Sequence, residues 1–112
     1  MSLVQEQSAF LLDFCKLVQY ATSIGFTVTS GELLRPVEMQ EIYVRTGRSK
    51  TMKSKHLQKL AGDLCFFKNG KYICNVKELE VIGNYWESLS SKNKWGGHFK
   101  TFKDAPHFER AI

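Results

Sequence analysis

The stretch LAGDLCFF at residues 60–67 is an apolar run interrupted by one carboxylate, Asp63. It is followed by KNGK at 68–71, which carries the Asn-Gly signal of a β-hairpin, and by YIC at 72–74 as the returning strand. We therefore predict a buried strand at 60–67 paired with a short antiparallel neighbour. A carboxylate inside such a strand is costly unless it is paired or binds a metal. The alternative is an Asp at a strand edge, bonded to the backbone or to a lysine.

Outward from this hairpin, apolar residues recur at helical spacing in several segments. The first, from Gln7 to Ile24, has Ser8 as a cap near its start and Gly25 after its end. The other expected elements are a strand at 26–29, a helix at 36–46, a helix at 76–89 capped by Asn75, a polar turn at 90–94 and a strand at 107–109. This order predicts an α+β fold, a small antiparallel sheet carrying helices, in one domain over residues 1–112.

The composition indicates an anionic partner but does not distinguish between kinds of anionic partner. The net charge is +5 and the pI is near 9.2, so the surface attracts nucleic acid, acidic lipids or anionic cell wall alike. The segment at 45–59 is rich in lysine and arginine and contains no acidic residue. We expect it to be a loop that is either solvated or in contact with an anionic partner. The three cysteines, Cys15, Cys65 and Cys74, lie in apolar runs and are expected to be buried free thiols.

No apolar stretch of the sequence is long enough to span a bilayer. The first seven residues lack the basic start and the cleavage site of a signal peptide. We therefore expect synthesis in a reducing cytoplasm, without membrane insertion.

The chain has three histidines, His56, His98 and His107, and all of them neighbour unusual segments. His56, Asp63 and His107 together would leave a fourth position open, which is the arrangement of a catalytic zinc ion. His56 and Asp63 are seven positions apart and would face opposite sides of a flat strand, so a turn or bulge must lie between them. Gly62 either supplies that freedom or marks close backbone packing.

Asp104 lies three positions before His107, and Pro106 keeps the backbone between them extended. A carboxylate at such a site can accept a proton from water and pass it to a leaving amine. The alternative for Asp-Ala-Pro is an ordinary turn.

Four short motifs follow one another between Thr29 and Glu109: Ser-x-His, Ala-x-Asp, Trp-Gly-Gly and Asp-x-Pro-His-Phe-Glu. In this order they resemble the zinc peptidases of bacterial cell walls. That family includes D-alanyl-D-alanine carboxypeptidases and dipeptidases, and the L-alanyl-D-glutamate endopeptidases of bacteria and phage endolysins. Its fold is related to lysostaphin-type peptidases and the Hedgehog signalling domain. The resemblance implies one zinc ion held by His56, Asp63 and His107, with Asp104 as the general base.

The resemblance also implies roles for residues around these ligands. Ser54 would support the site, and SGELLRP at 30–36 is similar to the family's Gly-x-Arg-x-Pro region, so Arg35 would steady the substrate's carbonyl or oxyanion. Arg35 lies one or two residues later than in many members, and without the resemblance it is a surface residue ahead of a helix. Trp95 is expected to pack beneath the site, and His98 to be a surface or substrate-side residue.

Two classes of function follow. The first is a monomeric zinc peptidase that cuts the peptidoglycan stem peptide at the L-alanyl-D-glutamate bond, with D-alanyl-D-alanine carboxypeptidase or dipeptidase activity as the close alternative. It would reach the wall after release from the cytoplasm, as through a phage holin. The second is a non-catalytic basic module that binds cell wall or nucleic acid, although no nucleic-acid signature is present.

Overall fold

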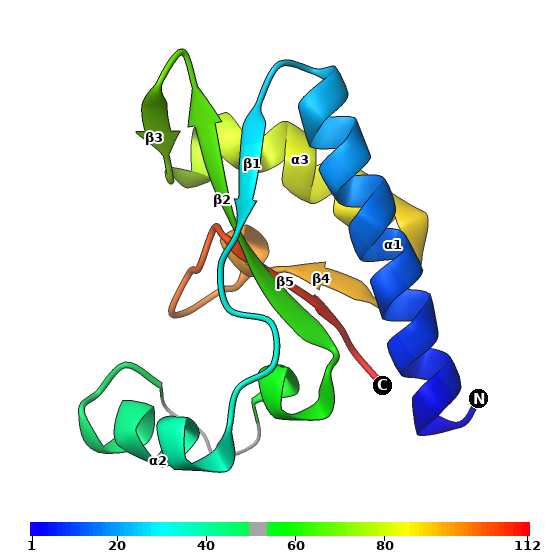
Figure 1. The fold of residues 1–112 in the computed structure, drawn as a ribbon, viewed down its shortest axis with the longest axis vertical. Helices are drawn as coiled ribbons and strands as arrows, with labels where there is room; N and C mark the ends of the chain where they lie inside the picture. The colour runs from blue at the N-terminus through cyan, green and yellow to red at the C-terminus, as the bar shows by residue number, and fades with distance from the viewer. Residues whose placement is uncertain (50–53) are drawn as a thin grey trace.

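The structure, a computed structural model, describes residues 1–49 and 54–112. Within these ranges five strands form one antiparallel sheet in the order β1-β2-β5-β4, with β3 paired to β2. The strands are β1 Thr27–Ser30, β2 Ala61–Lys68, β3 Lys71–Ile73, β4 Asn93–Trp95 and β5 His107–Arg110. Together with the helices, this sheet confirms the predicted α+β fold (Figure 1).

The described helices are α1 Leu3–Ser23, α2 Val37–Arg45 and α3 Val76–Leu89, with short 3-10 helices η1 Lys55–Gln58 and η2 Gly96–His98. Helices α1 and α3 contact each other and pack against the sheet, whereas α2 lies apart at the lower left of Figure 1. Asn75 caps α3 as expected, since its side chain accepts a hydrogen bond from the Glu78 backbone.

The two faces of the sheet have different neighbours. Gly62 of β2 lies under the Phe14 ring of α1, so close that an added Cβ would sit 2.7 Å from it. Phe108 of β5 packs edge-on against Trp86 of α3. The side chains of the buried core are Phe10, Phe14, Leu17, Ala21, Phe26, Leu60, Leu64, Phe66, Leu79, Ile82, Trp86, Trp95, Ala105 and Phe108. Because side chains alternate along a strand, the neighbours of Gly62 and Phe108 point to the face away from these helices.

Several sequence expectations are wrong. Helix α1 begins at Leu3 because Ser2 and Gln5 form a reciprocal capping box, so Ser8 is an interior helical residue. The expected buried thiols are exposed at Cys15 and Cys74 and only partly buried at Cys65. Cys15 lies on the outward side of α1, and Cys74 follows the end of β3. The basic segment is not all loop: Arg45 ends α2 and η1 follows, while residues 50–53 lie outside the described part of the chain.

The expected polar turn at 90–94 contains part of strand β4. This strand is short and polar, and it is held by partners distant in sequence. It pairs with β5, and the Trp86 indole donates to the carbonyls of both Lys94 and Glu109 across the pair.

A buried ion cluster joins the two ends of the chain. Glu6 of α1 is 5% exposed and accepts hydrogen bonds from Arg110 Nη2 at 2.8 Å and Lys92 Nζ at 2.7 Å. Because the cluster links α1 to both β5 and the segment before β4, it fixes how the helix sits on the sheet.

Among the described helices, none combines the length and apolar character that crossing a membrane requires.

Candidate active site

Asp63 and His107 meet because β2 and β5 pair in one particular register. The two residues are direct cross-strand partners, and Asp63 Oδ1 lies 3.2 Å from His107 Nδ1. Both side chains are on the face away from α1 and α3, where His107 is buried and Asp63 is partly exposed.

His56 reaches the same point from η1. Ser54 caps this 3-10 helix, and Lys59 turns the chain into β2 through a left-handed conformation with φ of 58°. The expected turn between His56 and Asp63 is therefore present, and it comes from Lys59. Gly62 instead provides close packing under Phe14. His56 is 1% exposed, with Nε2 3.2 Å from His107 Nδ1 and 3.3 Å from Asp63 Oδ1.

The outer nitrogen of each ring is already engaged. His56 Nδ1 lies 3.0 Å from the Leu33 carbonyl, and His107 Nε2 lies 2.8 Å from Glu109 Oε1. Since a carbonyl or an ionised carboxylate only accepts, those nitrogens carry the protons of the neutral rings. The inner nitrogens and Asp63 Oδ1 then point three lone pairs at one another, an arrangement that requires a proton or a cation between them.

The electrostatics of the cluster favour an ionised Asp63 and a positive charge on the ring of His107. Burial opposes ionisation of Asp63, but hydrogen bonds from His107 and His56 outweigh it and lower the pKa of Asp63 to about 2. Burial also disfavours the charged His107 ring, but hydrogen bonds to Asp63 and Glu109 raise the pKa of His107 to about 9.

The spacing of the three inner atoms fits a zinc ion. Ligands of tetrahedral zinc, with bonds of about 2.0–2.1 Å, lie about 3.3–3.4 Å from one another. The three separations here are 3.2, 3.2 and 3.3 Å. Two imidazole nitrogens and a carboxylate oxygen are also ligand types that zinc takes, and three protein ligands leave a fourth position open. His56, Asp63 and His107 can therefore hold one metal ion with an open position.

The cluster opens into a polar cleft of about 430 Å³. The residues lining it are Arg35, Arg48, Ser49, Ser54, Lys55, His56, Phe99, Thr101, Phe102, Asp104, His107 and Glu109. These residues come from the segments flanking α2, from η1, from the loop after η2 and from β5, so the cleft exists only in the folded chain.

Asp104 lies at the exposed rim of this cleft. Its backbone is held by hydrogen bonds to Gly96 and His107, and the buried Trp95 indole donates to the Ala105 carbonyl at 2.7 Å. Trp95 thus packs against the loop that carries Asp104. Among the described residues the Asp104 carboxylate has no hydrogen-bond partner. Partial loss of hydration, followed by the negative charge of Asp63, raises the pKa of Asp104.

Arg35 lies at the same cleft and is held on three sides. Its guanidinium donates to Glu32, to the fully buried Gln40 and to Ser54 Oγ at 3.2 Å. Ser54 Oγ also accepts a hydrogen bond from the His56 backbone at 3.3 Å. Ser54 therefore links Arg35 to His56 through these two hydrogen bonds.

His98 lies away from the cluster. Its side chain is 39% exposed and its Nδ1 lies 2.9 Å from Glu87 Oε1, which links η2 to α3. His98 is not among the residues that line the cleft, so of its two expected places the structure has the surface one.

Sequence reasoning missed three groups around the site: the Leu33 carbonyl, Gln40 and Glu109. Only Glu109 carried a usable signal, since it is two positions after His107 on a strand and must share its face. The other two depend on the path of residues 31–40, which the sequence pattern does not define.

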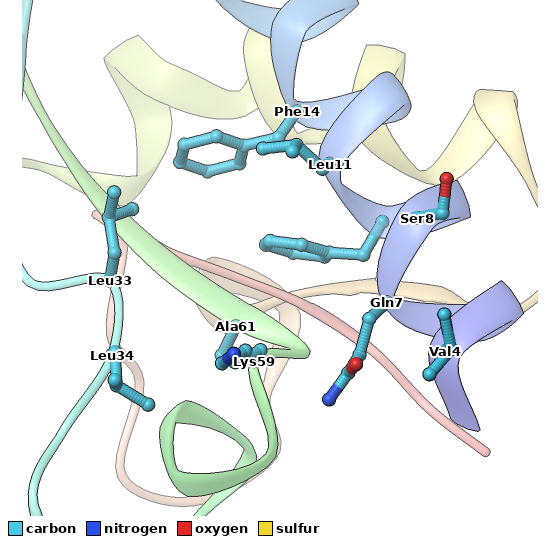
Figure 2. Close-up of a pocket in the computed structure, with 10 residues that line it drawn as sticks. Val4, Gln7, Ser8, Leu11, Phe14, Leu33, Leu34, Lys59 and Ala61 are labelled. Carbon is cyan, nitrogen blue, oxygen red and sulfur yellow. The ribbon is translucent and has the colours of Figure 1, made fainter.

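A second hollow, of about 450 Å³, lies between α1 and residues 33–34. Figure 2 shows Leu33 and Leu34 on one side and Leu11 and Val4 of α1 on the other. The lining is mainly apolar, and the cluster of His56, Asp63 and His107 lies outside it. The acid–base groups are thus gathered in the polar cleft.

An open His-Asp-His cluster beside a carboxylate, on one face of a small antiparallel sheet, fits the class of metal-dependent hydrolases. Comparison with family models agrees: the model described as D-alanyl-D-alanine carboxypeptidase matches residues 47–110. This is more than half of the chain, and the chain belongs to this family of peptidases. The matched range contains every proposed site residue except Arg35.

The fold is also that of a solved peptidase. The crystal structure of the L-Ala D-Glu endopeptidase ChiX from Serratia marcescens superposes with a TM-score of 0.72 and 27% sequence identity. The match covers 88% of this chain and 78% of that chain. Comparison with curated protein sequences gives no match.

Proposed function

We propose that this protein is a zinc peptidase that hydrolyses an amide bond in the peptidoglycan stem peptide. The observation that carries the proposal is the cluster of His56, Asp63 and His107, whose inner atoms lie 3.2–3.3 Å apart and open into the Asp104 cleft. A zinc ion bound by these three residues would polarise the scissile carbonyl and lower the pKa of water to about 7.

Asp104 is the proposed general base. Its carboxylate takes a proton from the attacking water as the water oxygen bonds to the carbonyl carbon. It then returns that proton to the leaving nitrogen as the C–N bond breaks, which yields a carboxylic acid and an amine, and the acid then passes its proton to the amine. The absence of a hydrogen-bond partner for this carboxylate among the described residues supports such a role.

Arg35 is the proposed electrophilic partner. Its Nε and Nη1 are bonded to Glu32, Gln40 and Ser54, and its Nη2 has no partner within the described ranges. The fixed guanidinium can therefore present a donor to the carbonyl oxygen while negative charge develops there.

The bond we favour is L-alanyl-D-glutamate, because ChiX, whose fold this chain shares, is an L-Ala D-Glu endopeptidase. The second candidate is the D-alanyl-D-alanine bond, which the family's description favours. We further propose that the protein acts as one domain and as a monomer. Release to the wall through a phage holin completes the proposal.

Digestion of purified peptidoglycan by the zinc-loaded protein, followed by mass spectrometry of the soluble fragments, tests the assignment. New N-terminal D-glutamate is the result expected for the favoured bond. Release of free D-alanine would instead select the second candidate. The proposed function would be contradicted if the protein binds no metal when incubated with zinc and releases no new peptide termini from peptidoglycan.

A further inference from the structure

Glu109 contacts the outer nitrogen of His107, on the side of the ring away from the candidate metal site. It follows His107 by two positions in β5, so both side chains lie on the same face of the strand. Glu109 Oε1 is 2.8 Å from His107 Nε2, and the Glu109 side chain is only 18% exposed. Among the described residues, His107 is the one hydrogen-bond partner of this carboxylate.

This contact decides which nitrogen of His107 is available to a metal. A neutral imidazole has one N–H and one lone pair, and an ionised carboxylate can only accept. Glu109 therefore holds the proton on Nε2 and leaves the lone pair on Nδ1, the atom that lies 3.2 Å from both His56 Nε2 and Asp63 Oδ1. Without Glu109, no other residue among those described would form a hydrogen bond with His107 Nε2. The imidazole ring would then be free to adopt the opposite tautomer or to rotate.

The two histidines of the cluster are held differently. His56 Nδ1 is fixed by the Leu33 backbone carbonyl, a neutral acceptor that no substitution removes. His107 is fixed by a carboxylate side chain, and a carboxylate bonded to the outer nitrogen of a histidine makes its metal-binding nitrogen more basic. Glu109 is thus the outer partner of the cluster that can be removed by substitution.

We propose that Glu109 is a positioning residue for zinc, which sets the Nδ1 lone pair and the ring orientation of His107. The proposal rests on the proposed function, since it assumes that His107 binds zinc. Glu109 itself acts through His107 and does not touch the reacting atoms.

The test compares zinc affinities of purified apo-proteins by competition with a chromophoric chelator. The Glu109→Ala variant is expected to bind zinc about 10–100-fold more weakly than the parent, the usual effect of losing such a partner. Glu109→Gln keeps an oxygen acceptor at the same place and should stay within about threefold of the parent. Glu80→Ala removes an exposed carboxylate from α3 and should leave the affinity unchanged.

A second readout follows the tautomer directly. In the apo-proteins at about pH 10, where the His107 ring is neutral because its pKa is about 9, long-range nitrogen–proton NMR should report a proton on Nε2 in the parent and in Glu109→Gln. A mixture of tautomers is expected in Glu109→Ala. Should Glu109→Ala fail to fold by circular dichroism, Glu109→Met, which keeps chain length without an oxygen, takes its place.

The outcomes separate this inference from the proposed function. A parent that binds zinc and cleaves peptidoglycan, beside a Glu109→Ala variant of unchanged zinc affinity, would overturn the inference alone. Equal weakening in Glu109→Ala and Glu109→Gln would also overturn it, because charge and not the hydrogen bond would then be responsible. A parent without zinc affinity would overturn both.

Discussion

Asp63 and His107 are direct cross-strand partners, and their side chains meet 3.2 Å apart on the sheet face opposite α1 and α3. A shift of one residue in this pairing would turn either side chain toward the helices. The register is held from the other face, where Gly62 lies beneath Phe14 and its cross-strand partner Phe108 packs on Trp86. The geometry of the site is therefore a consequence of how the core packs.

Replacing Asp63 by alanine should abolish tight zinc binding. The variant leaves two histidine nitrogens without the carboxylate, and we expect a loss in zinc affinity of at least about 100-fold, beyond the range for outer partners. The same competition assay measures it. His98→Ala is the matched control, because His98 lies outside the cleft and should keep one equivalent of zinc. Zinc loss in His98→Ala with retention in Asp63→Ala would refute the assignment.

Replacing Asp104 by asparagine should separate metal binding from chemistry. Asp104 lines the cleft but lies outside the His-Asp-His cluster, so zinc affinity should be retained. Loss of a general base lowers the rate by about 10²–10⁴-fold, and kcat on a synthetic stem peptide should fall by that factor. Lys100→Ala, in the same loop but exposed and outside the cleft lining, is the control and should keep its activity. A kcat within tenfold of the parent would exclude Asp104 as the base.

A methyl group on Gly96 should disturb the loop that carries Asp104. An added Cβ would lie 2.0 Å from the Asp104 carbonyl oxygen and 3.0 Å from His107 Cβ, and the first of these is a backbone atom that cannot move aside cheaply. We expect Gly96→Ala to lower the free energy of unfolding by about 1–3 kcal/mol, the usual cost of overpacking. Urea titration measures this change. A difference below about 0.5 kcal/mol, typical of surface substitutions, would show that the loop relaxes freely.

The sequence predicted those parts of the fold that local patterns define. The apolar run at 60–67, the Asn-Gly turn and the Asn75 cap each depend on neighbours within a few residues, and the structure has all three. Strand β4 was missed because its three residues are held by β5 and by the Trp86 indole, which are distant in sequence.

The candidate site shows the same division. The order of the motifs placed the cluster residues and Asp104 together, and the structure brings them to one cleft. Gln40 could not be found in this way. Its role depends on α2 folding back so that a fully buried amide meets Arg35, and no spacing rule connects the two.

Arg35 should matter for the rate and not for the metal. Lysine at this position keeps the charge, but replacing the bonds to Glu32, Gln40 and Ser54 would use all three of its donors and leave none for the substrate. We expect Arg35→Lys to lower kcat by about 10²–10³-fold, as for removal of one oxyanion donor, with zinc affinity unchanged. Arg45→Lys is the matched control, because Arg45 is exposed at the end of α2 outside the cleft and should keep its kcat. Unchanged kcat in Arg35→Lys would remove Arg35 from the mechanism.

Glu6 should make stability depend on pH. Hydrogen bonds from Lys92 and Arg110 lower the pKa of Glu6 below its ordinary 4.5. A carboxyl whose pKa is lowered by folding contributes stability above its unfolded pKa, and that contribution is lost as the pH falls through the folded pKa. Glu6→Gln should therefore be less stable than the parent at pH 7, and the difference should shrink at pH 3.

Urea unfolding at both pH values measures the effect of Glu6. Glu41→Gln is the control, because Glu41 is exposed on α2 and should behave as the parent does at either pH. At pH 7 and low temperature, where the variant is folded, its kcat should match that of the parent because Glu6 lies outside the cleft. A Glu6→Gln deficit of the same size at pH 7 and pH 3 would mean that the cluster stabilises the fold through packing alone, without its charge.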